Sequence, residues 1–566
     1  MIGTERIGEL MNVVGRTGIL KALYAAGAVV LLLVLAPHSL EPAGNVTRLY
    51  AFLSAPFMLY FLYRLIFVPQ TVDSFLKALY GACSALLLMA IAFNTVFSTA
   101  DTRGGYGFLA TAVVLCFSYY LVFVRAEPEG VVDTLSPILF FNLVIVVLFY
   151  YAGFEFGFKR NDFKVGFTYS NFWDFYYQAL TAAEGTFEAV NTGYFPFSYA
   201  ISKFFAVLAG WRPGFHNIRS GTVLIYFIFL MVFLSPLVLL AREIVVSKRF
   251  RGETVFFLGL FLAICYPVLF AVERGNFAII SFFFLSLMLY FYNRGKLGWC
   301  TVCAGLLVSL KVVNLLFVVF VIRYCFRQLG LFLGVVISVT VGSLIALFGF
   351  NVDKWAVFKY ALVAPFGHMV PDVVQQVFVA TDGGKLQGGA AGIEAFRVLL
   401  RTLIYSVNAN LTSDIAIWNL FLLAAGFVFF IYFYVRCRKT ADWLDEVMVL
   451  TTIPLLFHSA SAEYNLLLLM PALMLIASRE TSRYNNVLLR FSGLFLMLSG
   501  GIVIALVRVD SGQFNSVTPK SFLVPFSLLA LLLTIYIRKD LDRPGSSSEH
   551  AGGPISLEPD RDHARQ

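Results

Sequence analysis

Charged residues are scarce in this sequence. Asp, Glu, Lys and Arg make up only 13% of its 566 residues, against about 25% in an ordinary soluble domain. Hydrophobic residues make up 59%, and the mean hydropathy is +0.81. This composition excludes an ordinary soluble domain and predicts an all-α polytopic membrane protein. The net charge of +9 is therefore assigned to Lys and Arg in cytoplasmic loops, and no nucleic-acid partner is expected.

Other familiar signatures are also absent. The seven cysteines are scattered and form no disulfide framework, and the CxxC of Cys300 and Cys303 lies inside an apolar run, where packing is the expected role. No spacing of His, Cys, Asp and Glu indicates a metal site, and no cleavable signal precedes the first apolar run. The glycines near Asp382 lack the Lys-Ser/Thr of a phosphate-binding loop.

Long apolar runs are what the sequence has instead, and they predict a helical bundle of about sixteen membrane segments. They lie at 20–35, 49–68, 75–97, 108–124, 135–154, 222–241, 255–272, 277–292, 297–322, 329–350, 415–435, 447–457, 464–476, 487–507 and 522–537. We interpret the run at 297–322 as two short arms that turn near Lys311. If it were one span, the later Lys- and Arg-rich loops would lie on the outer side of the membrane instead of in the cytoplasm. The runs at 447–457 and 464–476 predict a second hairpin with a polar tip at 458–465.

The charge pattern also gives an orientation. The loop with Arg242, Lys248, Arg249 and Arg251 is expected in the cytoplasm, together with both termini. The protein is then a multi-pass protein of a plasma membrane, the inner membrane in a bacterium. The polar segments that follow the other ends of the spans fall on the outer, or periplasmic, face.

These segments divide the chain into six predicted regions. They are N-terminal membrane helices at 1–157, an outer loop with juxtamembrane helices at 158–220, membrane helices at 221–350, a long outer loop at 351–414, C-terminal membrane helices at 415–537 and a disordered cytoplasmic tail at 538–566.

The polar insert at 170–199 holds one carboxylate, Asp174, among aromatic residues. The predicted topology places it on the outer face with Arg274, Lys311 and the tip at 458–465. Ionisable groups at such positions are functional candidates because burying them is costly. The outer loops are therefore expected to form a site at the membrane–water boundary.

Short motifs in this part of the chain resemble the GT-C glycosyltransferases, most closely glycosyltransferase family 87. Residues 172–177 read Phe-Trp-Asp-Phe-Tyr-Tyr and are followed by Gly185 and by Tyr-Phe-Pro at 194–196. Residues 272–276 (Val-Glu-Arg-Gly-Asn), the run from Gly305 to Lys311, and the Ser-Ala-Glu-Tyr-Asn segment at 461–465 are similar to later family segments. Where the family has a Pro shortly after the Lys, this chain has Val312-Val313-Asn314. The resemblance covers about residues 165–480.

The resemblance implies a GT-C-like bundle and an inverting hexosyltransferase. The donor would be a polyprenyl-phosphate sugar, with mannose as the sugar that the family implies, and the acceptor a lipid or a glycan. Asp174 would be the catalytic general base, and Arg274 and Lys311 would stabilise the departing phosphate, supported by His458 and Tyr464. The remaining substrate-binding candidates are Tyr177, Asn276 and Glu463. No cofactor is implied beyond a divalent cation, which some GT-C enzymes use.

Each candidate also has a purely structural interpretation. Asp174 is a favoured residue for starting a helix, Lys311 is long enough to reach the membrane surface, Glu273 and Arg274 can form a surface ion pair, and His458 can be a neutral loop residue.

Two other function classes stay open. A polysaccharide polymerase or O-antigen-ligase-like enzyme would use the loop at 351–414 with Arg397 and Arg401. A transporter or lipid flippase would carry charged or broken-helix sites near the middle of the membrane.

Overall fold

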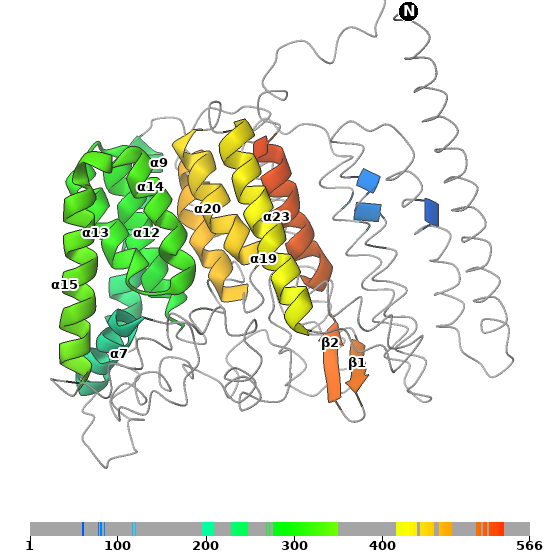
Figure 1. Cartoon of the computed structure of the whole chain (residues 1–566), viewed down its shortest axis with the longest axis horizontal. Coiled ribbons are helices and arrows are strands. Elements are labelled where there is room, and N and C mark those ends of the chain that lie inside the picture. The colour runs from blue at the N-terminus through cyan, green and yellow to red at the C-terminus, as the bar shows by residue number, and fades with distance from the viewer. Residues whose placement is uncertain are drawn as a thin grey trace, which may run out of the picture.

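The structure, a computed structural model, is a bundle of near-parallel helices (Figure 1). It describes residues 195–208, 228–246, 276–348, 415–437, 442–457, 463–477, 505–510, 513–517 and 520–536, with isolated positions between 59 and 119 and at 268 and 271. These residues are almost entirely helical, in agreement with the predicted all-α class.

Helices α12 (Ala278–Asn293) and α13 (Leu297–Val308) form the centre of the first half of the bundle. The chain reverses between them at Gly295, which has a φ of 69°. Only glycine adopts this left-handed conformation at no steric cost. Apolar residues of α12 are buried along most of its length, including Ile279, Phe282 and Leu285. The two helices therefore pack side by side as an antiparallel pair.

The run at 297–322 is a hairpin, as the charge pattern predicts. After α13 the chain turns at Lys311 and continues through the 3-10 helix η4 (Val312–Leu316) into α14 (Phe317–Tyr324). Cys300, in the first turn of α13, and Cys325, directly after α14, have their Sγ atoms 3.9 Å apart. Contact between the beginning of one arm and the end of the other shows that the arms run antiparallel.

Helix α15 (Leu329–Phe348) follows α14 through the short 3-10 helix η5 (Phe326–Gln328). It packs closely on α13, since a Cβ atom added at Gly305 would lie 2.8 Å from Cγ1 of Val335. Among the residues that the structure describes, the stretch Phe326–Phe348 is the one long and apolar enough to cross a membrane, and only 22% of its 18-residue window is buried. The sixteen segments and their orientation remain predictions.

Helix α7 (Pro196–Leu208) covers one end of this first half. The backbone N–H of Phe195 donates a hydrogen bond to the carbonyl of Leu310 at 2.9 Å. Lys203 Nζ donates to the carbonyl of Ala346 at 3.1 Å, at the carboxyl end of α15, where a cation complements the helix dipole. Helix α9 (Pro236–Val246) packs against α12 and α21.

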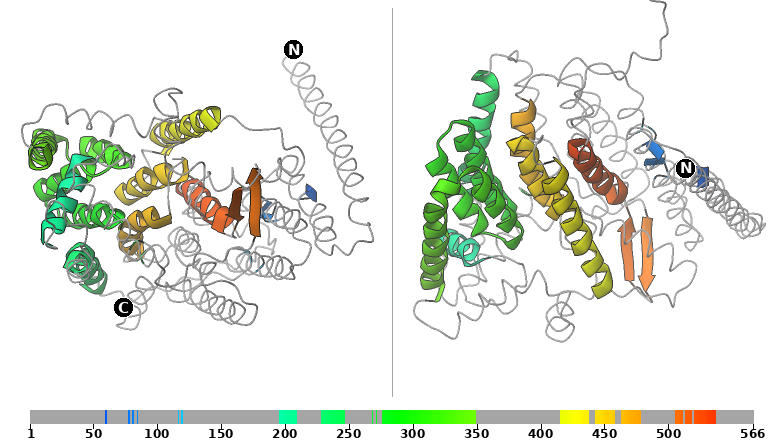
Figure 2. Two further views of the ribbon diagram at one scale, coloured as in Figure 1. Left: turned by 90° about the horizontal axis from the view of Figure 1, so that it is seen from below. Right: turned by 45° about the horizontal axis from the view of Figure 1, so that its top comes forward.

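The second half of the bundle contains α19, α20 and α23, which Figure 2 shows beside the helices of the first half. Gly426 on α19 lies against Phe457, and Tyr434, which follows α19, lies against Glu446, so α19 and α20 run antiparallel. The predicted second hairpin corresponds to α20 and to η9 with α21, which contact each other. Their bounds are α19 Ile415–Tyr432, the π-helical turn η8 Phe433–Cys437, α20 Trp443–Phe457, η9 Glu463–Leu469, α21 Met470–Ala477 and α23 Lys520–Tyr536.

One predicted boundary is wrong. The segment predicted at 487–507 reaches Val507, but Ala505–Asp510 form strand β1, which pairs antiparallel with β2 (Gln513–Val517). In β1 apolar and polar residues alternate only from Val507 to Asp510, and the following Ser511-Gly512 is a pattern typical of a two-residue hairpin loop. The predicted segment extends too far because the hydropathy of a run does not distinguish the periodicity of a helix from that of a strand.

Helix α23 connects the second half to an earlier part of the chain. The ring of Phe526 lies 5.0 Å from the ring of Tyr80, which in turn lies 5.7 Å from the ring of Tyr119. Apart from such isolated positions, the first five predicted segments lie outside the described residues, as do the insert at 170–194, the loop at 351–414 and the tail at 538–566.

The hairpin geometry makes Cys300 and Cys325 a testable pair. Treating the protein in membranes with copper–phenanthroline should link these two cysteines, because their sulfur atoms need to approach by only about 2 Å to reach disulfide distance. The two thiols lose two electrons and two protons to the oxidant. Mass spectrometry of alkylated, non-reduced peptides detects the linked pair.

The variant Cys303→Ser is the matched control, since Cys303 is buried on the same helix one turn later. It should keep the link between residues 300 and 325, whereas Cys325→Ser should abolish it. The antiparallel hairpin would be contradicted if the wild-type protein linked Cys303 to Cys325 in place of Cys300, or if it formed no disulfide at all.

Candidate functional site

The structure describes two of the predicted site residues with their side chains, Asn276 and Lys311, and brings them to the same end of the bundle. Glu463 and Tyr464 are the first two residues of η9, and only their backbone is described. The predicted residues that lie outside the described part of the chain are Asp174, Tyr177, Arg274 and His458.

Lys311 occupies the turn of the hairpin between α13 and α14. Its backbone is extended, with φ −151° and ψ 144°, and its side chain is partly buried. The neighbouring carbonyl of Leu310 accepts two hydrogen bonds, from the backbone N–H of Phe195 at 2.9 Å and from Ser198 Oγ at 2.7 Å. Broken helices at membrane depth are tolerated only where such freed backbone groups find partners inside the protein. Helix α7 therefore completes the turn that presents Lys311.

Asn314 closes the same turn from the other side. It is only 1% exposed, and its Nδ2 donates hydrogen bonds to the Leu307 carbonyl at 3.0 Å and to Ser281 Oγ at 3.2 Å. These bonds join η4 to the end of α13 and to the beginning of α12. The sequence comparison registered Asn314 only as a departure from the family pattern. A buried amide in an apolar run was the signal for its role, because such a group must be hydrogen-bonded.

Asn276 has a local role that the substrate-binding prediction does not include. It is 2% exposed, and its Oδ1 accepts a hydrogen bond from the backbone N–H of Ala278 at 2.9 Å. Its own N–H donates to the Ala271 carbonyl at 3.1 Å. Asn commonly turns the chain in this way at the beginning of a helix. Asn276 therefore shapes the start of α12.

Lys311 supplies the positive charge at its end of the bundle. Helices α7, α12 and α14 begin there, but α13 and α15 end there, so the partial positive charges of the helix N-termini are offset by the partial negative charges of the C-termini. Helix α20 begins at the opposite end, beside the end of α14, and runs back toward this one, so η9 with Glu463 starts near it. The ammonium group of Lys311 suits an anionic ligand such as a phosphate.

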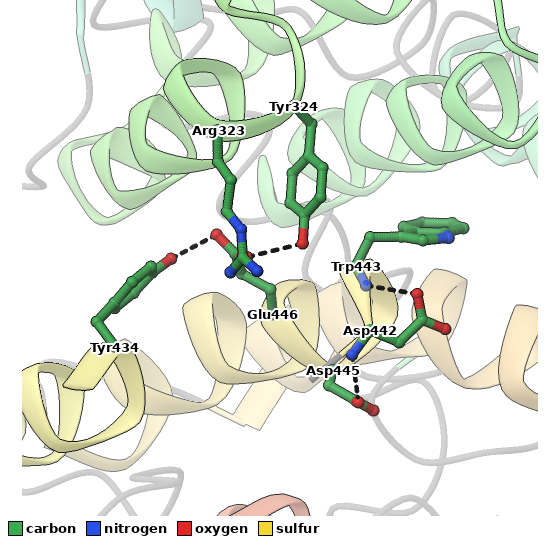
Figure 3. Close-up of polar contacts among 7 residues, drawn as sticks. All are labelled: Arg323, Tyr324, Tyr434, Asp442, Trp443, Asp445 and Glu446. Carbon is green, nitrogen blue, oxygen red and sulfur yellow. Dashed lines mark hydrogen bonds and ion pairs between the residues drawn. The ribbon is translucent and has the colours of Figure 1, made fainter. Parts of the chain in front are cut away.

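The opposite end contains a buried carboxylate, Glu446, on the first turn of α20 (Figure 3). Oε2 forms an ion pair with the Arg323 guanidinium and accepts a hydrogen bond from Tyr324 Oη at 2.9 Å. Oε1 accepts a hydrogen bond from Tyr434 Oη, and Tyr434 lies in the π-helical turn η8. Both oxygens of Glu446 are thus engaged, and the side chain is 0% exposed.

The Glu446 cluster (Arg323, Tyr324, Tyr434 and Glu446) joins three parts of the bundle, α14, η8 and α20. The start of α20 is further fixed by Asp445 Oδ2, which accepts a hydrogen bond from the N–H of Asp442 at 2.9 Å. Sequence analysis missed Glu446 because its partner Arg323 is 123 residues away. The available signal was an acidic residue directly before an apolar run, since such a group requires a partner when it is buried.

No group of three or more His, Cys, Asp or Glu side chains placed to hold a metal ion occurs among the residues that the structure describes.

Comparison with known proteins gives no relative: no family model, curated protein or solved structure matches the chain. The resemblance to the GT-C glycosyltransferases thus stays a prediction from short motifs.

The Glu446 cluster can be tested through stability. The variant Glu446→Gln should lower the free energy of unfolding by about 3–5 kcal/mol, because it leaves Arg323 without its carboxylate partner. Tyr434→Phe should cost about 1.5–3 kcal/mol, the range for a hydrogen bond to a charged group. Melting curves of the purified protein in detergent measure both losses.

Tyr432→Phe is the matched control, since Tyr432 is close in sequence but about half exposed and outside the cluster. Its melting temperature should equal that of the wild type. Equal melting temperatures for Tyr434→Phe and Tyr432→Phe would show that the Glu446 cluster does not stabilise the fold.

Proposed function

We propose that the chain is a membrane glycosyltransferase. It moves a hexose, with mannose as the favoured sugar, from a polyprenyl-phosphate carrier to a lipid- or glycan-linked acceptor at the outer membrane face. Transfer inverts the anomeric centre, and Asp174 is the general base. The motifs around Asp174, Arg274 and Lys311 suggest this activity.

The structural observation that supports the proposal most is the turn at Lys311. An ammonium group is carried on a break between two short helices, in a bundle whose buried residues are mostly apolar. The break is maintained by Phe195 and Ser198 at the start of α7 and by Asn314 in η4, so two separate parts of the chain specify the position of Lys311. Membrane proteins use interrupted helices of this kind to bind charged substrates within the bundle.

The proposed reaction assigns one task to each charged group. Asp174 accepts the proton of the acceptor hydroxyl as its oxygen attacks the anomeric carbon of the donor. The bond between that carbon and the phosphate oxygen breaks, and the lipid phosphate leaves with the electron pair. Lys311 and Arg274 stabilise the negative charge that develops on the leaving phosphate. The predicted outer region at 158–220 contains both Asp174 and α7, and α7 contacts the Lys311 turn directly.

Loss of the general base Asp174 and loss of the phosphate-binding Lys311 should give different kinetic results. In an assay with a lipid-linked sugar donor, Asp174→Asn should lower kcat by about 10²–10⁴-fold, the usual contribution of a general base. Lys311→Gln should raise the KM for the donor and also lower kcat, because the lysine binds the phosphate before and during bond breaking. Lys311→Arg should change KM and kcat less than Lys311→Gln does, since arginine keeps the positive charge.

Asp162→Asn is the control for Asp174, because it removes another carboxylate from the same predicted loop. It should retain full activity. A folded Asp174→Asn protein with wild-type transfer activity would refute the role of the base. If the wild type transfers no sugar from any polyprenyl-phosphate donor, the proposed activity itself is wrong.

A further inference from the structure

The end of the bundle opposite Lys311 carries a second concentration of positive charge. It is formed by the turn between α12 and α13 and by η5, and its exposed residues are Arg294, Lys296, Trp299, Phe326 and Arg327, here called the basic–aromatic rim. The contact between Cys300 and Cys325 holds the two segments side by side. The rim is therefore a structured surface formed by residues about thirty positions apart in the sequence.

The segment of the chain that forms the rim carries no acidic residue of its own. The sequence from Asn276 to Phe348 contains no Asp or Glu. Arg323, next to the rim, is already paired with Glu446. Lys296 and Arg327 are exposed, and within the described part of the chain no carboxylate pairs with either of them. A negatively charged group from outside the described residues would meet two cations here.

The rim also exposes large apolar rings. Trp299 is 62% exposed and Phe326 is 64% exposed, although both lie next to charged residues. The Trp299 ring lies 6.0 Å from the ring of Phe291, which supports its outward position. Phe326 begins the 23-residue stretch that is long and apolar enough to cross a membrane, and the side chains of Leu333 and Ile337 further along it are exposed. Aromatic rings and cations at the end of a span are typical of the level of the lipid headgroups.

We propose that the basic–aromatic rim binds the headgroup of an anionic phospholipid. Lys296 and Arg327 contact the phosphate, and Trp299 and Phe326 lie against the glycerol and the upper part of the acyl chains. A soluble anion would use the two cations but would leave both rings and the exposed face of α15 in water, which is why a lipid is the better fit. Basic surfaces between membrane helices bind anionic lipids through this chemistry. The proposal does not depend on the transferase activity.

The experiment uses the full-length protein purified in a neutral detergent. Native mass spectrometry measures binding of phosphatidylglycerol, and of phosphatidylcholine as the zwitterionic comparison. The wild type should bind phosphatidylglycerol more tightly. Each of Lys296→Gln and Arg327→Gln should weaken this binding about fivefold, and the double variant about 25-fold, from the usual contribution of one basic residue near an anionic membrane surface.

Two variants separate lipid binding from folding. Lys203→Gln removes a cation from the other end of α15 and should leave lipid binding unchanged. The double variant Lys296→Arg with Arg327→Lys keeps the charge and should bind phosphatidylglycerol as the wild type does. The link between Cys300 and Cys325 checks that the hairpin is intact in every variant.

Three results would overturn the proposal. They are equal binding of phosphatidylglycerol by the wild type and the charge-removing double variant, equal binding of the two lipids by the wild type, and displacement of phosphatidylglycerol by millimolar inorganic phosphate. The last would identify a site for soluble anions.

Discussion

The hydrogen bonding of a few backbone groups decides the architecture of this bundle. In apolar surroundings an unpaired carbonyl or N–H costs several kcal/mol, so a helix can be interrupted only where other groups replace its internal bonds. At the break before Lys311, the carbonyl of Leu310 is bound by Phe195 and Ser198, and that of Leu307 by Asn314. The position of α7 and the shape of the hairpin both follow from this requirement.

The two ends of the bundle are built by different means. At one end, the Glu446 cluster and the contact of Cys300 with Cys325 connect α13, α14, η8 and α20 through buried side chains. At the other end, helices α7, α12 and α14 begin around an extended turn with a partly buried lysine. Because buried contacts fix the helices at one end, the other end can hold polar groups that contribute less to stability. This division agrees with a site at the Lys311 end, which the proposed transferase activity requires.

Within the described residues, the helical class and several helix positions could be predicted from the sequence, because apolar runs and charged interruptions are local signals. The reversal at Lys311 was found by counting charged loops, and α12, α15 and α23 lie close to the predicted segments. The β-hairpin was missed because its strands adjoin an apolar run. Glu446 and Asn314 were missed for a different reason. Their roles depend on partners brought close by folding, and one residue next to an apolar run does not identify such a partner.

The contact of Ser198 with Leu310 has a consequence for biosynthesis. The two residues are 112 positions apart, and ribosomes add about 5–20 residues per second, so α7 waits about 6–22 s before its partner has been made. During this interval the hydroxyl of Ser198 and the N–H of Phe195 need other acceptors. The chain must therefore either keep α7 at the water boundary until the hairpin arrives or give it a temporary partner, such as a membrane chaperone.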